Sequence, residues 1–322
     1  MTAPVDLTPE RTASEVASQP PRRRVIRRNR RTERVGPLPP LSARAQLARA
    51  VFVLMAVVGG CLLLQLVVLS GLQERSAQQQ KFDAFRAQVA EGTAPLGSVN
   101  ADNEALAPGA PMAYLEIPAI GLSQVVLEGT ASAVMFEGPG HRRDSPFPGQ
   151  PGTTVILGRR ATFGGPFSQL ADLEQGDEIR VTTGQGEFTY QVIGVRRENE
   201  PAPPTLGSGK GRMLLVTADG RPYFPDGILR VDADLTSDPV GGVSPLFAPS
   251  GLPATEKIMA ADTTTLWALV MWLQVLVAAV IGFVWAWHRW GRTKAWIVGV
   301  PLLLLVGLNV ADQTARLLPN LL

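Results

Sequence analysis

The side chains that could do chemistry in this chain are few, and they do not form a familiar catalytic set. The 322 residues include one cysteine and two histidines. Cys61 lies inside an apolar run, where a small thiol is most often a packing residue. His141 follows a glycine-rich turn, where hydrogen bonding within a loop is the simpler expectation. With so few sulfur and imidazole ligands, the sequence predicts no metal site and no cofactor.

Arginine, threonine and aspartate provide the other candidates. Arg159 and Arg160 follow a β-branched run, and such a pair could bind an anion or a C-terminal carboxylate, or be a solvated charge. Thr217 carries a hydroxyl, but successive strand residues face opposite sides, so it should point away from the side of Ala218. Threonine would also need a base, and Asp219 is more simply a solvated turn residue.

Three apolar blocks are candidates for membrane helices, at residues 50–72, 265–288 and 295–313. A helix needs about 20 apolar residues to cross a hydrocarbon core of about 30 Å. The third block is the shortest and contains Asn309. The first block is longer than the apolar region of a cleaved signal peptide, so we expect an anchor.

The basic residues predict how these helices are oriented. Residues 1–49 form an arginine-rich tail that we expect to be disordered, and a basic segment from His288 to Lys294 separates the second and third blocks. Basic flanks stay in the cytoplasm. We therefore expect a multi-pass protein of the cell membrane, with a cytoplasmic N-terminus and the central domain outside. No aromatic residue interleaves the arginines of the tail, so no nucleic acid partner is expected.

Composition predicts three regions between the first two membrane blocks. Residues 73–111 should form a helical stalk and a flexible spacer, and residues 237–264 a linker rich in Pro, Gly, Ser and Thr. Residues 112–236 alternate short β-branched or aromatic runs with Gly/Pro turns, which predicts an all-β domain. A short helical candidate lies between Phe167 and Leu173. We expect strands at 114–117, 124–127, 153–157, 178–182, 187–196, 212–217 and 228–234.

Within this domain a series of motifs keeps a characteristic order, spacing and turn chemistry. They are Ile117–Leu122, Val125–Thr130, Gly138–His141, Pro148–Gly152 and Phe163–Phe167. This pattern resembles the sortases, membrane-anchored cysteine transpeptidases of Gram-positive bacteria, and most closely the class E type of actinobacteria. The resemblance implies an eight-stranded β-barrel held outside the cytoplasmic membrane.

The same resemblance implies a reaction for which this chain lacks the residues. Sortase chemistry needs a thiolate to attack the Thr–Gly carbonyl of a sorting peptide, a histidine to move protons and an arginine to hold the oxyanion. The matching positions hold Ala218, Arg159 and Ile228, respectively. Alanine has no nucleophile, and arginine keeps its proton at physiological pH. The sequence therefore predicts a degenerate sortase, a pseudoenzyme.

The function expected of such a protein is noncovalent. We expect it to bind a sorting-signal-like peptide or an envelope or membrane protein, as a scaffold or regulator in cell-envelope protein assembly. Arg230 follows Ile228 by two residues and shares its strand face, so it could meet a peptide carbonyl or carboxylate. The candidates for a peptide groove are Arg159, Arg160, Thr217, Ala218 and Arg230. Two alternatives stay open: an active transpeptidase or hydrolase with substitute residues, and an accessory subunit of a membrane complex.

One further string, Leu252–Glu256, resembles the start of a sorting signal and precedes an apolar block. Glu256 departs from the usual glycine of such a signal. These residue types are common in this chain, so a chance match is the simpler interpretation, and a substrate-like or self-docking tail is the alternative.

Overall fold

The computed structural model describes residues 42–99, 104–242, 248, 251–261 and 263–322. Two compact units divide the chain, Met1–Gln46 and Leu47–Leu322, and the second contains the barrel and the apolar helices. Most of the predicted basic tail lies outside the described residues. Its expected end at residue 49 is wrong, because helix α1 (Ala43–Leu64) already begins at Ala43. Ser42 explains the early start, since its Oγ accepts a hydrogen bond from the amide of Ala45.

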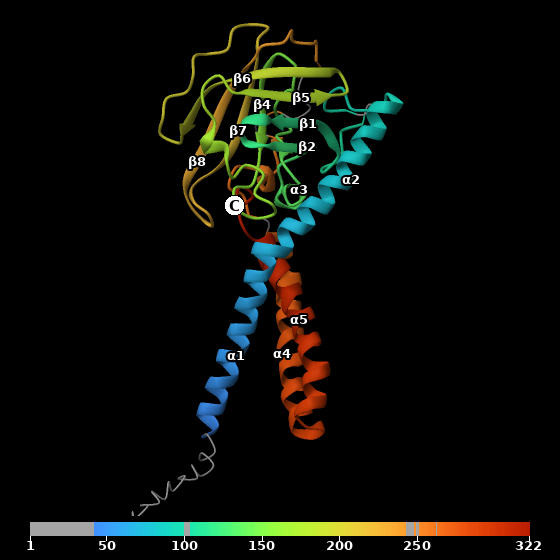
Figure 1. Cartoon of the computed structure of the whole chain (residues 1–322), viewed down its shortest axis with the longest axis vertical. Coiled ribbons are helices and arrows are strands. Elements are labelled where there is room, and N and C mark those ends of the chain that lie inside the picture. The colour runs from blue at the N-terminus through green and yellow to red at the C-terminus, as the bar shows by residue number, and fades with distance from the viewer. Residues whose placement is uncertain (1–41, 100–103, 243–247, 249–250, 262) are drawn as a thin grey trace, which may run out of the picture. The chain divides into compact units, whose positions relative to one another are not determined.

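Eight strands close into a barrel in the order β1, β2, β3, β4, β7, β8, β6, β5 (Figure 1). The eight-stranded β-barrel expected from the sequence is confirmed, and the expected strands fall within β1, β2 and β4 to β8. The strands are β1 (Pro111–Ile117), β2 (Leu122–Glu128), β3 (Gly140–His141), β4 (Gly152–Leu157), β5 (Glu178–Thr183), β6 (Gly186–Arg197), β7 (Gly211–Arg221) and β8 (Phe224–Leu235).

Alternation along the strands separates the barrel interior from its outer side. In β7, Met213 and Leu215 belong to the interior core, whereas Val216 and Ala218 belong to a second apolar cluster. β8 follows the same rule, since Leu229 is an interior residue. The side of the barrel on which a β7 residue lies therefore follows from its position in the alternation.

β4 and β7 are neighbours and run parallel, with Leu157 opposite Val216. The amide of Gly158 continues this ladder by donating to the Val216 oxygen at 3.0 Å. Parallel strands end at the same edge of a sheet. Arg159, just after β4, and Ala218, near the end of β7, are therefore brought close together.

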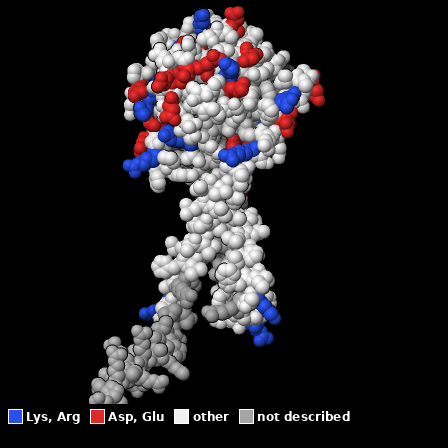
Figure 2. All heavy atoms as spheres, viewed as in Figure 1, with Lys and Arg blue, Asp and Glu red and all other residues white. Residues whose placement is uncertain are grey.

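The first apolar block is part of a continuous run of helix. α1 leads into a π-helical turn (Gln65–Leu69) and then into α2 (Ser70–Glu91), which ends at Gly92 with a φ of 70°. Among the residues that the structure describes, three helices are long and apolar enough to cross a membrane: Val51–Glu91, Leu266–Trp290 and Thr293–Arg316. Figure 2 shows charged side chains over the barrel, while the visible middle part of the helices is free of them.

Helices α4 (Leu266–Trp290) and α5 (Arg292–Arg316) pack side by side and are separated only by Gly291, whose φ is 85°. Both are longer than the predicted blocks at 265–288 and 295–313. Asn309 does not interrupt α5, because its Nδ2 donates to the Leu305 oxygen one turn back at 2.8 Å. Cys61 is buried in the helical region, where a Cβ placed on Gly307 would lie 2.8 Å from its Sγ. The thiol thus fills a packing position between α1 and α5.

Several short elements were not predicted. They are the two-residue strand β3, helix α3 (Ser132–Met135) and the 3-10 turns Pro118–Ile120, Ala254–Glu256 and Thr263–Thr265. The helical candidate between Phe167 and Leu173 contains a 3-10 turn at Leu170–Asp172.

Candidate functional site

The outer side of β4 and β7 carries Val155, Leu157, Val216 and Ala218, and we call it the β4–β7 face. All four residues are buried, Ala218 completely. The apolar cover includes Met135 of α3 and two residues that follow α5, Leu321 and Leu322. The position expected for a nucleophile is thus an alanine beneath apolar side chains.

Arg159 is the largest fully buried side chain beside this face, with 0% exposure. Its Nε donates to the Met135 oxygen at 3.2 Å, and its Nη2 donates to Ser132 Oγ at 2.7 Å. Its Nη1 lies 3.0 Å from Thr162 Oγ1, 3.2 Å from the Leu322 oxygen and 3.4 Å from the Pro319 oxygen. The interpretation of Arg159 as a solvated charge is therefore wrong, because its hydrogen bonds all go to acceptors of the chain in a site closed to solvent.

Aromatic rings complete the surroundings of this guanidinium. Its central carbon lies 4.7 Å from the ring centroid of Phe136 and 5.2 Å from that of Phe163. No Asp or Glu in the described part of the chain forms an ion pair with Arg159. Burial lowers the pKa of Arg159 to about 9, which leaves it protonated at pH 7. It can donate hydrogen bonds there but cannot act as a general base.

The loop that carries Arg159 rests on the stalk helix α2. The Phe163 amide donates to Ser70 Oγ at 3.3 Å, and a Cβ on Gly164 would lie 2.5 Å from Glu74 Oε2. Burial raises the pKa of Glu74 to about 7, although the hydrogen bond from Gln124 lowers it. The stalk therefore helps to position the loop, and a titratable group lies at their contact.

A peptide segment of the chain itself, Leu318–Leu322, lies on the β4–β7 face. We call it the tail segment. Its main-chain oxygens accept hydrogen bonds from the amides of Arg160, at 3.0 Å from Leu321, and Thr162, at 3.3 Å from Leu322. The hydroxyl of Thr162 also donates to the Leu322 oxygen. Sequence reasoning missed this segment, whose only local signal was a Leu–Pro pair after an apolar block.

The other residues proposed for a groove divide between the two sides of the barrel wall. Arg160 is partly buried, and its Nη1 donates to the Ala218 oxygen at 3.0 Å. Ile228 lies opposite Ala218, and Arg230 lies opposite Val216 and is partly exposed. Thr217 lies on the interior side, and its buried Oγ1 has no hydrogen-bond partner among the described residues. The structure thus brings together Arg159, Arg160, Ala218, Ile228 and Arg230, but not Thr217.

The prediction that Asp219 is a solvated turn residue is wrong. β7 and β8 continue their pairing past the site, so Asp219 is a strand residue opposite Gly227. Its Oδ2 lies 3.1 Å from Nε of Arg197. This carboxylate takes part in an ion pair across the strands.

His141 belongs to strand β3 and to a buried polar network. Its Nδ1 lies 2.9 Å from Glu128 Oε2, and its Nε2 lies 3.1 Å from Ser145 Oγ. The order hydroxyl, imidazole, carboxylate is that of a nucleophile with its base. However, Ser145 Oγ donates to the Arg142 oxygen and accepts from the Val155 amide, and all members are at most 3% exposed. The network holds β3 against β4 and has no access to a substrate in this conformation.

The string Leu252–Glu256 lies beside the tail segment. Glu256 is buried, with Oε1 3.7 Å from Arg143 Nη1, and its main-chain oxygen accepts from Thr130 Oγ1 at 2.6 Å. Burial raises the pKa of Glu256, and the Arg143 charge opposes this. This part of the linker therefore packs against the barrel through a charged side chain.

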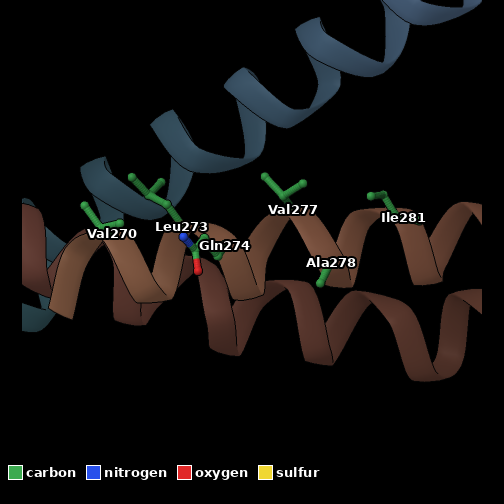
Figure 3. A pocket seen from close by; sticks show the side chains of 6 residues that line it. All are labelled: Val270, Leu273, Gln274, Val277, Ala278 and Ile281. Carbon is green, nitrogen blue, oxygen red and sulfur yellow. The ribbon is translucent and has the colours of Figure 1, made fainter. Parts of the chain in front are cut away.

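A shallow apolar groove runs along α4, far in sequence from the β4–β7 face (Figure 3). Val270, Val277 and Ile281 lie along one side of the helix. The groove is lined by Val270, Leu273, Gln274, Val277, Ala278 and Ile281. In the part of the chain that the structure describes, no cluster of three or more His, Cys, Asp or Glu could hold a metal ion.

Comparison with known proteins gives a consistent result. A family model described as a sortase domain matches residues 115–225. Sortase D of Bacillus subtilis is 30% identical over 148 residues, which are 45% of this chain and 73% of that protein.

Among solved structures, sortase E from Streptomyces avermitilis has 29% sequence identity and a TM-score of 0.36, over 47% of this chain and all of the other. The sortase D5 transpeptidase of Clostridium perfringens has 22% identity and a TM-score of 0.42, over 50% of this chain and 99% of the other. Because the match to the Bacillus subtilis protein spans most of that relative, the chain belongs to the sortase family.

Proposed function

We propose that this chain is a membrane-held sortase-family protein that binds peptide segments on its β4–β7 face without covalent chemistry. It would act as a scaffold or regulator in the assembly of cell-envelope proteins, with the barrel outside the cytoplasmic membrane. The resemblance to sortases supports both the peptide class, sorting-signal-like segments, and the envelope setting.

The observation that carries this proposal is the environment of Arg159. A proton carrier is expected at this position from the resemblance, but the guanidinium instead donates to the main-chain oxygens of Pro319 and Leu322. Hydrogen bonds from a charged donor to carbonyl oxygens are among the stronger ones in proteins. The same site offers no thiol, since Ala218 lies at the neighbouring strand end. The residues present support holding a peptide and give no evident route for cleaving it.

The test uses the purified full chain in mild detergent with a fluorescent Leu-Pro-Ala-Thr-Gly peptide. Anisotropy measures binding, and mass spectrometry detects cleavage or transpeptidation. We expect binding and no turnover, because loss of a nucleophile and its base costs several orders of magnitude in rate. Turnover that disappears in Ser145→Ala would revive the enzyme alternative through the His141 network.

A matched pair of arginine variants tests where the peptide binds. Arg230→Ala removes a partly exposed charge on β8, beside the β4–β7 face. A charge-assisted hydrogen bond contributes about 1.5 to 3 kcal/mol, so affinity should fall roughly tenfold to a hundredfold. Arg180→Ala on β5 removes an exposed arginine distant in the barrel order and serves as the control. Equal affinities for both variants would argue against this face.

A second candidate function, a subunit of a membrane complex, is favoured by Gln274. This residue is exposed on α4, and none of the described residues forms a hydrogen bond with it. An unpaired amide in hydrocarbon is costly, so such residues usually bond to a neighbouring helix. Gln274→Leu should reduce copurification of a membrane partner, whereas Val277→Leu on the same groove should not. A complex that survives Gln274→Leu would contradict this candidate.

A further inference from the structure

We infer that the β4–β7 face recognises peptides of the type Asn-Leu-Leu, and that the chain supplies one to itself. The tail segment Leu318–Leu322 is this built-in ligand. An outside peptide can bind to the face only after it displaces the tail segment. The inference rests on the proposed function for the outside peptide, but not for the occupancy of the face by the tail segment.

The main chain of the tail segment is recognised like that of a bound peptide. Leu321 and Leu322 each present a main-chain oxygen to an amide of the loop after β4, from Arg160 and Thr162. Arg159 adds contacts to the oxygens of Pro319 and Leu322. These contacts are made to the main chain, so they fix the path of a peptide but do not select its side chains.

The side chains of the tail segment account for the sequence preference. Leu321 is 0% exposed and Leu322 is 6% exposed, and both pack against Ala218 and its neighbours. The Nδ2 of Asn320 donates to the main-chain oxygens of Thr130 and Lys257, at 2.9 Å each. This face therefore favours a ligand with an amide side chain followed by two apolar side chains.

One feature of how the tail segment binds the β4–β7 face favours its replacement by an outside peptide. The Oδ1 of Asn320 is buried and has no hydrogen-bond partner among the described residues. A buried acceptor that is left unpaired weakens the complex. The built-in ligand is thus not the tightest one the face can hold, and a segment that satisfies this position can compete.

The tether decides how strongly an outside peptide must compete. α5 ends at Arg316, so a single residue, Leu317, separates the helix from the tail segment. Arg316 is itself held, with its Nε 2.9 Å from Asp312 Oδ2 and its guanidinium over the Phe136 ring that also contacts Arg159. A short tether gives an effective concentration on the order of millimolar. Only partners that are abundant, or concentrated at the membrane, should therefore displace the tail segment from the β4–β7 face.

Thiol labelling of the purified full chain tests occupancy and exchange. In a Cys61→Ser background, Leu322→Cys should react with a maleimide at least tenfold more slowly than Ser208→Cys, which lies in an exposed loop. Synthetic Leu-Pro-Asn-Leu-Leu should speed the reaction of Leu322→Cys several-fold, and Leu-Pro-Asn-Asp-Asp should not. Equal rates for the two cysteines, or slow labelling that saturating peptide leaves unchanged, would overturn the inference.

Peptide binding to a chain that lacks residues 318–322 separates this inference from the proposed function. This variant should bind fluorescent Leu-Pro-Asn-Leu-Leu at least tenfold more tightly than the full chain does. If the deletion unfolds, Leu321→Ala combined with Leu322→Ala keeps the main-chain contacts and gives the same readout. Binding of Leu-Pro-Ala-Thr-Gly but not Leu-Pro-Asn-Leu-Leu would overturn only the inference, and binding of neither would overturn both.

Discussion

A guanidinium that is sealed from water and forms no ion pair with an aspartate or glutamate of the described chain must satisfy its donors with hydroxyl and main-chain oxygens, and Arg159 does so. Its contacts join the loop after β4, helix α3 and the tail segment. A residue of this kind stabilises the fold only as long as every acceptor stays in place. Arg159 therefore links the integrity of the site to the position of the tail.

Arg159→Ala should lower the free energy of unfolding by about 1 to 3 kcal/mol, the cost of leaving a buried hydrogen-bonding group unsatisfied. Ser132 and the main-chain oxygens around it would be left without their donor. Thermal unfolding of the detergent-purified chain measures the effect, with Arg180→Ala as an exposed control expected to change stability by under about 0.5 kcal/mol. Similar melting temperatures for the two variants would contradict the role given to Arg159.

Glu74 predicts a dependence of stability on pH. Its pKa in the folded chain is about 7, above the ordinary value of 4.5, so the folded state binds a proton that the unfolded state has lost. This group therefore destabilises the fold increasingly as the pH rises from about 4.5 through 7. Glu74→Gln removes the effect, so its melting temperature should exceed that of the parent more at pH 8 than at pH 5.

The control for this experiment is Asp83→Asn, which alters an exposed carboxylate on the same helix α2. A gain of the same size and pH dependence in this variant would show that the effect is not specific to Glu74. A gain in melting temperature for Glu74→Gln that is the same at pH 5 and pH 8 would show that its carboxyl group does not titrate in this range.

At the scale of elements, the sequence predicted those strands and helices whose apolar residues repeat with a regular period. The strands that alternate over many residues, such as β6 and β8, were found close to their observed bounds. β3 was missed because two residues are too few to show a period, and α3 because its four residues form a single turn. The predicted third span, 295–313, is shorter than α5 at both ends. Asn309 lies inside it, and its side chain bonds back to its own helix.

The candidate site was predicted only in part. Strand alternation placed Thr217 away from Ala218, and the observed interior cluster agrees with that arrangement. The burial of Arg159 could not be foreseen, since arginine is mostly exposed and its acceptor on Leu322 lies 163 residues away. Such a contact depends on the whole path of the chain through α4 and α5, which leaves no local sign.

Gly158 joins β4 to the loop that carries Arg159, and it has no room for a side chain. A Cβ there would lie 2.3 Å from the ring of Phe167, which is fully buried. Gly158→Ala should therefore destabilise the chain by about 1 to 3 kcal/mol through overpacking. Gly194→Ala in β6 is the matched control, because a Cβ at that position meets nothing within 4 Å. Equal unfolding midpoints would show that the loop can shift at no cost.

At the scale of the whole molecule, the arrangement of basic residues predicts which parts are outside the cell. In a Cys61→Ser background, Ser208→Cys should react with a membrane-impermeant maleimide in intact cells. Thr293→Cys, exposed in the first turn of α5, should react only after permeabilisation. The reverse pattern would place the barrel in the cytoplasm and remove the envelope role.

The separation of the tail segment from the barrel along the chain has a consequence for biosynthesis. The last barrel strand ends at Leu235, but Leu321 and Leu322, which complete the cover over Ala218, are made only after α4 and α5. Translation proceeds from the N-terminus, and domains fold as units while the chain emerges. A newly made barrel therefore presents a β4–β7 face that is only partly covered until α5 has been inserted. During that interval a segment within reach meets no competition from the tail segment.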